Sequence, residues 1–105
     1  MSPETEPRNA SMLAEKARLP AHAVYRAFVK ETVILNLQSG TYHGLNPTGG
    51  RMLEALERAP TVGEAAGRLA EEYGQPLEDI ERDLCDFCSD LLERGLIELE
   101  SPEPS

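Results

Sequence analysis

The fold of this chain is decided by residues 31–58, which read Glu31-Thr-Val-Ile-Leu-Asn-Leu-Gln-Ser-Gly-Thr-Tyr-His-Gly-Leu-Asn-Pro-Thr-Gly-Gly-Arg-Met-Leu-Glu-Ala-Leu-Glu-Arg58. The β-branched and apolar run Thr32–Leu37 predicts a strand, and Gly40 supplies the positive-φ residue of a tight turn. Thr41–Leu45 predicts a short second strand. A unit this compact leaves one strand at the edge of a sheet, where a further strand from a peptide can be added.

Helix start and stop signals divide the chain after the strands. Asn46 can cap the orphan N–H groups of a helix whose first position is Pro47. Thr61 and Glu64 form a capping box, and Gly74 is the expected end of that second helix. The expected elements are strands at Ala23–Val29, Thr32–Leu37 and Thr41–Leu45, and helices from Asn46 to Pro60, Thr61 to Gly74 and Pro76 to Arg94.

The two ends of the chain carry weaker patterns. Residues 1–20 are expected to be an extension, largely disordered or with a short helix over Asn9–Leu19 that Pro20 stops. Residues 21–99 are expected to form the folded domain, with Leu96–Leu99 folding back on it. Residues 100–105 are expected to be a disordered tail.

The length of the chain limits the number of domains, and its charge limits the kinds of partner. At 105 residues the chain is long enough for one domain, and its net charge of −9 makes nucleic acid and anionic membranes poor partners. A basic peptide or protein surface is a better one. No apolar run approaches the ~20 residues that span a bilayer, and the acidic, Pro-rich start is not a secretory signal, so a cytoplasmic location is expected.

Three antiparallel strands followed by three helices predict an α+β fold of the winged helix-turn-helix type, an architecture that commonly binds DNA. The last helix argues against DNA because its charges would be repelled by phosphates. Its acidic residues are Glu78, Asp79, Glu81, Asp83, Asp86, Asp90 and Glu93, opposed only by Arg82 and Arg94.

Five segments, in this order and spacing, resemble the PqqD family. They are Thr32-Val-Ile-Leu-Asn-Leu, Gly40-Thr-Tyr-His-Gly-Leu-Asn46, Thr61-Val-Gly-Glu-Ala-Ala, Glu81-Arg-Asp-Leu and Leu91-Leu-Glu-Arg-Gly-Leu-Ile97. The family is named after the small chaperone of pyrroloquinoline quinone biosynthesis. Its fold also recognises the leader peptides of ribosomally made, modified peptides, including lasso peptides. The resemblance implies that a leader adds as a strand beside the third strand, in the cleft between that strand and the third helix.

This resemblance places the peptide against five residues of the third strand, namely Thr41, Tyr42, His43, Gly44 and Leu45. On the third helix, a projection at about 100° per residue extends the apolar face from Leu84 toward Cys85 and Leu92. We therefore expect the other wall of the groove to contain Glu81, Cys85, Cys88 and Leu92. The alternative is that Leu92 only packs on the segment Leu96–Leu99.

Other chemistry is less favoured. Cys85 and Cys88 form a CxxC pair, but Cys85 lies in mid-helix among carboxylates, which raise a thiol pKa, whereas a redox pair needs it lowered. A zinc site completed by His22 and His43 has no sign of convergence. His43 lacks a nucleophile to activate. Small buried or groove-lining cysteines are the favoured interpretation, and no metal, cofactor or enzymatic activity is expected.

The leading hypothesis is therefore a protein that binds the leader of a ribosomal precursor peptide by strand addition. It would present that peptide to a tailoring enzyme such as a leader peptidase, a cyclase or a radical S-adenosylmethionine enzyme. The first alternative is a PqqD-type chaperone serving a radical S-adenosylmethionine enzyme in pyrroloquinoline quinone biosynthesis. The second is a winged-helix DNA-binding regulator, and a thiol oxidoreductase comes last.

Overall fold

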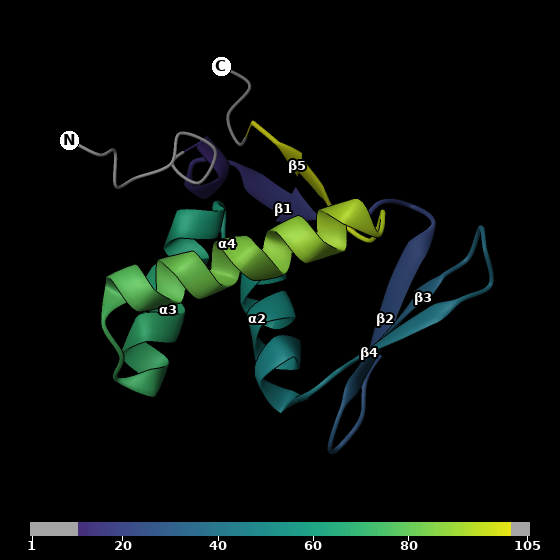
Figure 1. Ribbon diagram of the computed structural model, residues 1–105, viewed down its shortest axis with the longest axis horizontal. Coiled ribbons are helices and arrows are strands. Elements are labelled where there is room, and N and C mark those ends of the chain that lie inside the picture. Colours follow the sequence, from purple (N-terminus) through teal and green to yellow (C-terminus); the bar gives the residue numbers. More distant parts are fainter. Residues whose placement is uncertain (1–10, 102–105) are drawn as a thin grey trace.

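The computed structural model describes residues 11–101, which form two small sheets, the helices α2–α4 and a short helical stretch at residues 11–13 (Figure 1). The helices α2–α4 lie together on one side of the three-stranded sheet. The strands are β1 (Lys16–Arg18), β2 (Ala23–Ala27), β3 (Thr32–Asn36), β4 (Tyr42–Leu45) and β5 (Glu98–Glu100). The helices are α2 (Pro47–Arg58), α3 (Val62–Tyr73) and α4 (Leu77–Glu93).

The three-stranded sheet is an antiparallel meander in the order β2-β3-β4, so β4 lies at an edge as predicted. The β3–β4 turn ends at Gly40, whose φ of 76° confirms the need for glycine there. The register aligns Ile34 of β3 with His43 of β4, and Leu35 with Tyr42. The α+β class and the winged helix-turn-helix description, used loosely, are confirmed.

The predicted helix boundaries are also confirmed by their hydrogen bonds. The Asn46 side chain accepts a hydrogen bond from the Gly49 N–H at 2.8 Å, which caps α2. The Thr61 hydroxyl accepts one from the Glu64 N–H at 3.0 Å, which caps α3. Gly74 ends α3 in the left-handed conformation, with a φ of 65°.

Close contact between α2 and the sheet explains one of the two glycines at the helix start. A Cβ on Gly50 would lie 2.5 Å from Oγ1 of Thr32, which is less than van der Waals contact. Glycine therefore allows the first turn of α2 to press against β3. Since β4 ends at Leu45 and α2 begins at Pro47, the chain passes from the edge strand directly into the helical layer.

The core lies between the sheet and the helices and extends between α3 and α4. Leu84, the expected centre of the buried face of the last helix, is fully buried. The largest fully buried side chains are Ile34, Leu53, Val62, Leu69, Leu84, Cys85, Cys88 and Leu91. Each helix thus contributes apolar residues at helical spacing to one shared core.

The expected helix over Asn9–Leu19 is present only in part: residues 11–13 are helical, but the helix does not continue to Leu19. Residues 9 and 10 lie outside the described residues, and residues 16–18 form β1, which pairs with β5. Ala17 is 2% exposed and lies opposite Leu99, so β5 supplies the partner strand that local propensity could not reveal. The Lys16 ammonium donates hydrogen bonds to the carbonyls of Leu56, Glu57 and Ala59, at the C-terminal end of α2.

None of the helices between residues 11 and 101 is both long enough and apolar enough to cross a membrane.

Candidate functional site

The open edge of β4 presents unpaired backbone groups, and the hydrogen bonds of the sheet identify which ones. In an antiparallel ladder, hydrogen-bonded residue pairs alternate with non-hydrogen-bonded pairs. The Asn36 N–H donates to the Thr41 carbonyl at 2.8 Å, so this pair belongs to the hydrogen-bonded class. Counting along the register, His43 is paired with Ile34 in the same way.

The other side of β3 gives the same answer independently. The Leu37 N–H donates to the His22 carbonyl at 2.6 Å, which makes Leu35 bond to β2 and leaves Ile34 to bond to β4. The N–H and C=O of His43 therefore point inward, toward β3. Those of Tyr42 and Gly44 point outward, where a further strand can bond to them.

A groove runs beside this edge, between β4 and α4. Its larger part is an open cavity of about 460 Å³ near the start of α2. The lining residues are Gly44, Leu45, Asn46, Thr48, Gly49, Met52, Asp83, Asp86, Phe87 and Asp90. A smaller hollow of about 170 Å³ at the other end of β4 is lined by Ile34, Asn36, Thr41, Tyr42, His43, Arg94 and Leu96. The five expected residues of the third strand all line one of these two spaces.

The helical wall of the groove differs from the expected one. Asp83, Asp86, Phe87 and Asp90 line it, whereas Cys85 and Cys88 are 1% and 0% exposed. Glu81 and Leu92 line neither space. The apolar residues of α4 beyond Leu84 pack within the helical layer, where α4 lies against α3, so the flank of α4 that lines the larger cavity is the acidic one. The recurrence of aspartate at positions 83, 86 and 90 was the signal for the flank that faces β4.

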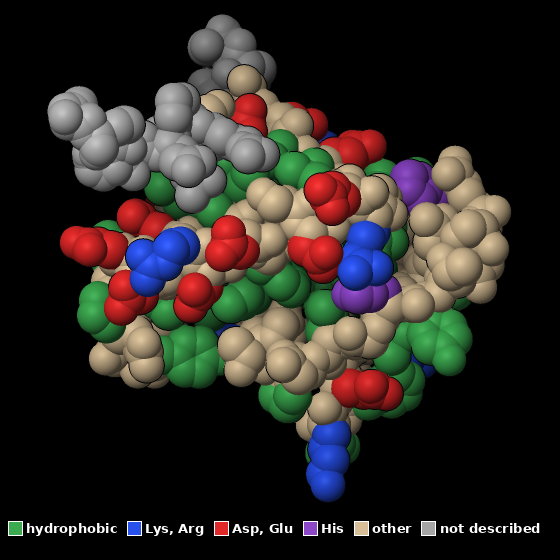
Figure 2. All heavy atoms as spheres, viewed as in Figure 1, with side chains coloured by type: hydrophobic (Ala, Val, Ile, Leu, Met, Phe, Trp, Pro, Cys, Tyr) green, Lys and Arg blue, Asp and Glu red, His purple; other side chains and the backbone are tan. Residues whose placement is uncertain are grey.

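The groove wall is acidic. Red side chains follow α4 across the front of the molecule (Figure 2). The only cation lining either space, among the described residues, is Arg94, and it forms an ion pair with Asp90 at 3.2 Å. Leu45, Met52 and Phe87 supply apolar surface between these charges. The groove therefore suits an extended segment with apolar side chains and basic neighbours.

The thiols of α4 are not suited to redox chemistry. Burial raises the pKa of the Cys88 thiol to about 12. Burial, with the nearby charges of Asp86 and Glu81, raises the pKa of the Cys85 thiol as well. In residues 11–101, no three histidine, cysteine or acidic side chains are grouped so that they could hold a metal ion. The His22 ring instead lies 2.9 Å from the carbonyl of Gly95.

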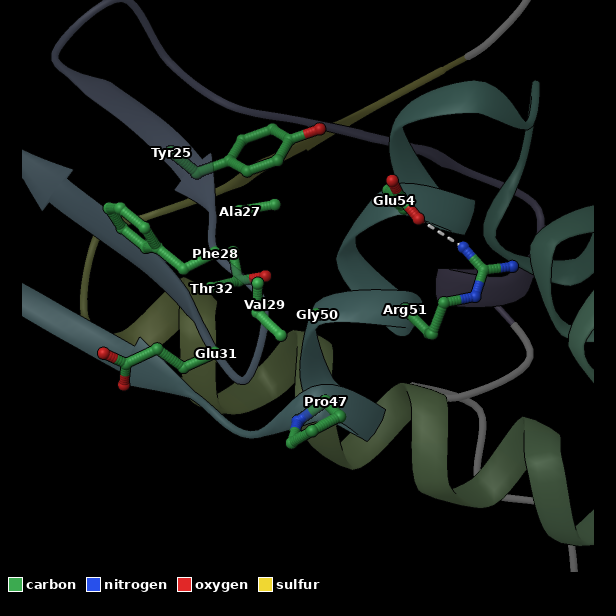
Figure 3. A pocket seen from close by; sticks show the side chains of 10 residues that line it. All are labelled: Tyr25, Ala27, Phe28, Val29, Glu31, Thr32, Pro47, Gly50, Arg51 and Glu54. Atoms are coloured by element: carbon green, nitrogen blue, oxygen red, sulfur yellow. Dashed lines mark hydrogen bonds and ion pairs between the residues drawn. The ribbon is translucent and has the colours of Figure 1, made fainter.

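A third hollow, of about 220 Å³, lies between the β2–β3 hairpin and the start of α2 (Figure 3). The Arg51 side chain at its rim forms ion pairs with Glu54 and Glu72. The hydrogen bonds that Arg51 donates to the Glu72 carboxylate raise the pKa of Arg51, so the guanidinium is already engaged by carboxylates. This hollow has about half the volume of the larger cavity beside β4.

An α+β domain with an open edge strand beside a groove belongs to the structural class that can take up an extended strand. Comparison with known proteins gives the family. Residues 31–97 match the family described as coenzyme PQQ synthesis protein D (PqqD), and the chain belongs to it.

Two solved structures are similar to the chain. One is TbiB1 in complex with the TbiA(beta) leader peptide, with 34% identity and a TM-score of 0.69, covering 77% of this chain and 94% of that one. The other is a lasso peptide synthetase B1 complexed with its leader peptide, with 27% identity and a TM-score of 0.69, covering 79% of this chain and 98% of that one. No curated protein sequence matches the chain.

Proposed function

We propose that this protein binds the leader segment of a ribosomally made precursor peptide and presents the precursor to a tailoring enzyme. The observation that carries the proposal is the open edge of β4 with a hollow beside each end of the strand. Two similar structures, TbiB1 and the lasso peptide synthetase B1, contain a leader peptide.

The leader would bind as a fourth strand of the sheet. The outward N–H and C=O groups of Tyr42 and Gly44 would supply the backbone hydrogen bonds, which contribute affinity without reading sequence. Alternate leader side chains would point into the groove, toward Phe87 and the three aspartates of α4. Apolar and basic leader residues at those positions would then provide specificity.

The domain is proposed to bind and not to catalyse. The buried thiols, with their raised pKa values, are poor nucleophiles, and the outward groups of β4 are backbone amides. Bond cleavage, cyclisation or radical chemistry on the precursor would belong to the partner enzyme. A cytoplasmic location, expected from the sequence, is part of the proposal.

The second candidate is a peptide chaperone in pyrroloquinoline quinone biosynthesis, because the matching family carries that description. It would use the same groove, so only the identity of the bound peptide separates the two. A DNA-binding role is disfavoured by the aspartates that α4 displays.

Fluorescence anisotropy with a labelled synthetic leader, taken from the precursor gene nearest to the gene for this chain, tests the proposal. We expect saturable binding that unlabelled leader reverses and a scrambled peptide does not. Asp86→Lys should weaken binding and slow association at low salt. Glu81→Lys is the matched control, because it makes the same charge change outside the groove. Absence of binding by the unmodified chain would overturn the proposal.

A further inference from the structure

The outer face of the three-stranded sheet, turned away from α2–α4, is unusually apolar. We define this outer sheet face by Val24, Arg26, Leu35, Leu37 and Tyr42. Side chains on one face of a strand recur at every second residue, which places these five together. Val24 is 46% exposed, Leu37 56% and Tyr42 75%.

The apolar side chains form a continuous row. The register aligns Val24 of β2 with Leu35 of β3 and Leu35 with Tyr42 of β4, so the row crosses the whole sheet and ends at the open edge. Scattered exposed apolar residues are ordinary on a soluble protein, whereas contiguous ones mark interaction surfaces. Every helix from α2 to α4 lies on the opposite side of the sheet (Figure 1).

The hairpin that joins β2 to β3 supports the same conclusion. Phe28 is 57% exposed and Val29 97%, at a turn where glycine, asparagine or aspartate would be more usual. Five of the seven large apolar side chains exposed among the described residues belong to this sheet and its turns; the other two are Tyr73 and Leu77. Turn chemistry therefore does not account for these apolar residues.

A leader added beside β4 would extend the outer sheet face. If the proposed function holds, every second leader side chain points into the groove, and the others stand next to Tyr42 on the outer side. A protein that covers this face would then touch the chain and the leader at once. This continuity fits the enzyme that must act on the bound precursor.

The charge of the chain favours the processing enzyme over a second copy of the chain as the partner that covers this face. A net charge of −9 disfavours self-association. Arg26, which lies within the outer sheet face, forms no ion pair with any residue between 11 and 101. We propose that the outer sheet face is the docking surface for the enzyme that processes the bound precursor, and that this enzyme offers an apolar patch with a carboxylate for Arg26.

The test uses the full chain, the labelled leader, the precursor and the purified enzyme encoded beside the precursor gene. Val24→Lys places a charge at the β2 end of the row, with β3 and β4 between it and the leader. We expect its leader affinity to stay within about twofold of the unmodified chain, while the concentration giving half-maximal processing rises by about tenfold. Leu77→Lys is the matched control: that residue is 47% exposed on α4, and neither quantity should change.

Arg26→Glu is the second variant, at an exposed site that the fold does not need. It should raise the half-maximal concentration in the same way, with circular dichroism unchanged. Unchanged half-maximal concentrations in both variants, or an equal rise for Leu77→Lys, would overturn the docking surface while leader binding stands. A dimer of the unmodified chain that Val24→Lys dissociates, seen by sedimentation velocity, would assign the face to a second copy instead. Failure of the unmodified chain to bind leader would overturn the proposed function and this inference together.

Discussion

Proline substitutions at two adjacent positions of β4 separate folding from leader binding. Proline removes one backbone N–H and leaves the rest of the strand in place. The His43 N–H points toward Ile34, whereas the Tyr42 N–H points toward the open edge. The two variants therefore carry the same change in backbone chemistry on opposite sides of one strand.

His43→Pro should lower the stability of the fold, whereas Tyr42→Pro should lower the affinity for the leader. In His43→Pro the lost hydrogen bond costs about 1 kcal/mol, and the unsatisfied carbonyl of Ile34 adds about 1–3 kcal/mol, so stability falls by about 2–4 kcal/mol. Tyr42→Pro loses no bond within the sheet and keeps most of its stability apart from φ strain. It should instead weaken leader binding by about 1 kcal/mol or more, which is about fivefold in Kd.

Urea unfolding followed by circular dichroism gives the stabilities, and anisotropy with labelled leader gives the affinities. Tyr42→Ala is the control, because it removes the same side chain and keeps the N–H. Equal destabilisation by both proline variants would refute the alternation worked out for β4. A folded Tyr42→Pro that binds leader at full strength would show that β4 is not the docking edge.

Three further predictions concern the core. Cys85→Arg should destabilise the fold by an amount comparable to Leu84→Ala, about 2–5 kcal/mol in urea unfolding, because the site is 1% exposed; a loss of leader binding with full stability would instead return Cys85 to the groove wall. Gly50→Ala should lower the free energy of unfolding by about 1–3 kcal/mol, because its Cβ would clash with Thr32. Gly67→Ala, which has open space at its Cβ, should raise the free energy of unfolding by up to about 1 kcal/mol. Equal shifts in melting temperature for the two variants would contradict the close contact at Gly50. The raised pKa of Cys88 favours its neutral thiol in the folded state, so stability should be full below the pKa of an unfolded thiol, about 8.5, and fall as pH rises toward about 12. Cys88→Ala should reduce this loss of stability at alkaline pH in denaturation curves. An unchanged loss would refute the conclusion that the pKa of Cys88 is raised by folding.

Signals that lie close together in the chain were sufficient to predict the three-stranded sheet and the boundaries of α2–α4. Asn46, Thr61 and Gly74 each act on backbone groups within four residues, so their caps could be predicted without knowing the rest of the fold. The same is true of Gly40 at the β3–β4 turn. The position of β4 at the sheet edge followed from the meander that these short connections impose.

Contacts between distant segments were beyond the reach of such signals. Residues 16–18 form a strand because residues 98–100 pair with them, and that pairing overrides any local preference for a helix. The groove wall depends on how α4 is rotated about its axis, which packing against α3 decides. The apolar pattern alone marked Cys85 as an edge of the buried stripe, but the rotation placed it inside the core and turned Asp83, Asp86 and Asp90 toward β4.

By itself, the sequence determined the order of β2–β4 and α2–α4, the caps and turns between them, and the strand edge where a peptide can bind, because each depends on interactions between near neighbours in the chain. The tertiary structure alone decided which backbone groups of β4 face outward, which flank of α4 lines the groove and which face of the sheet is left uncovered. These depend on register and helix rotation, and long-range packing sets both.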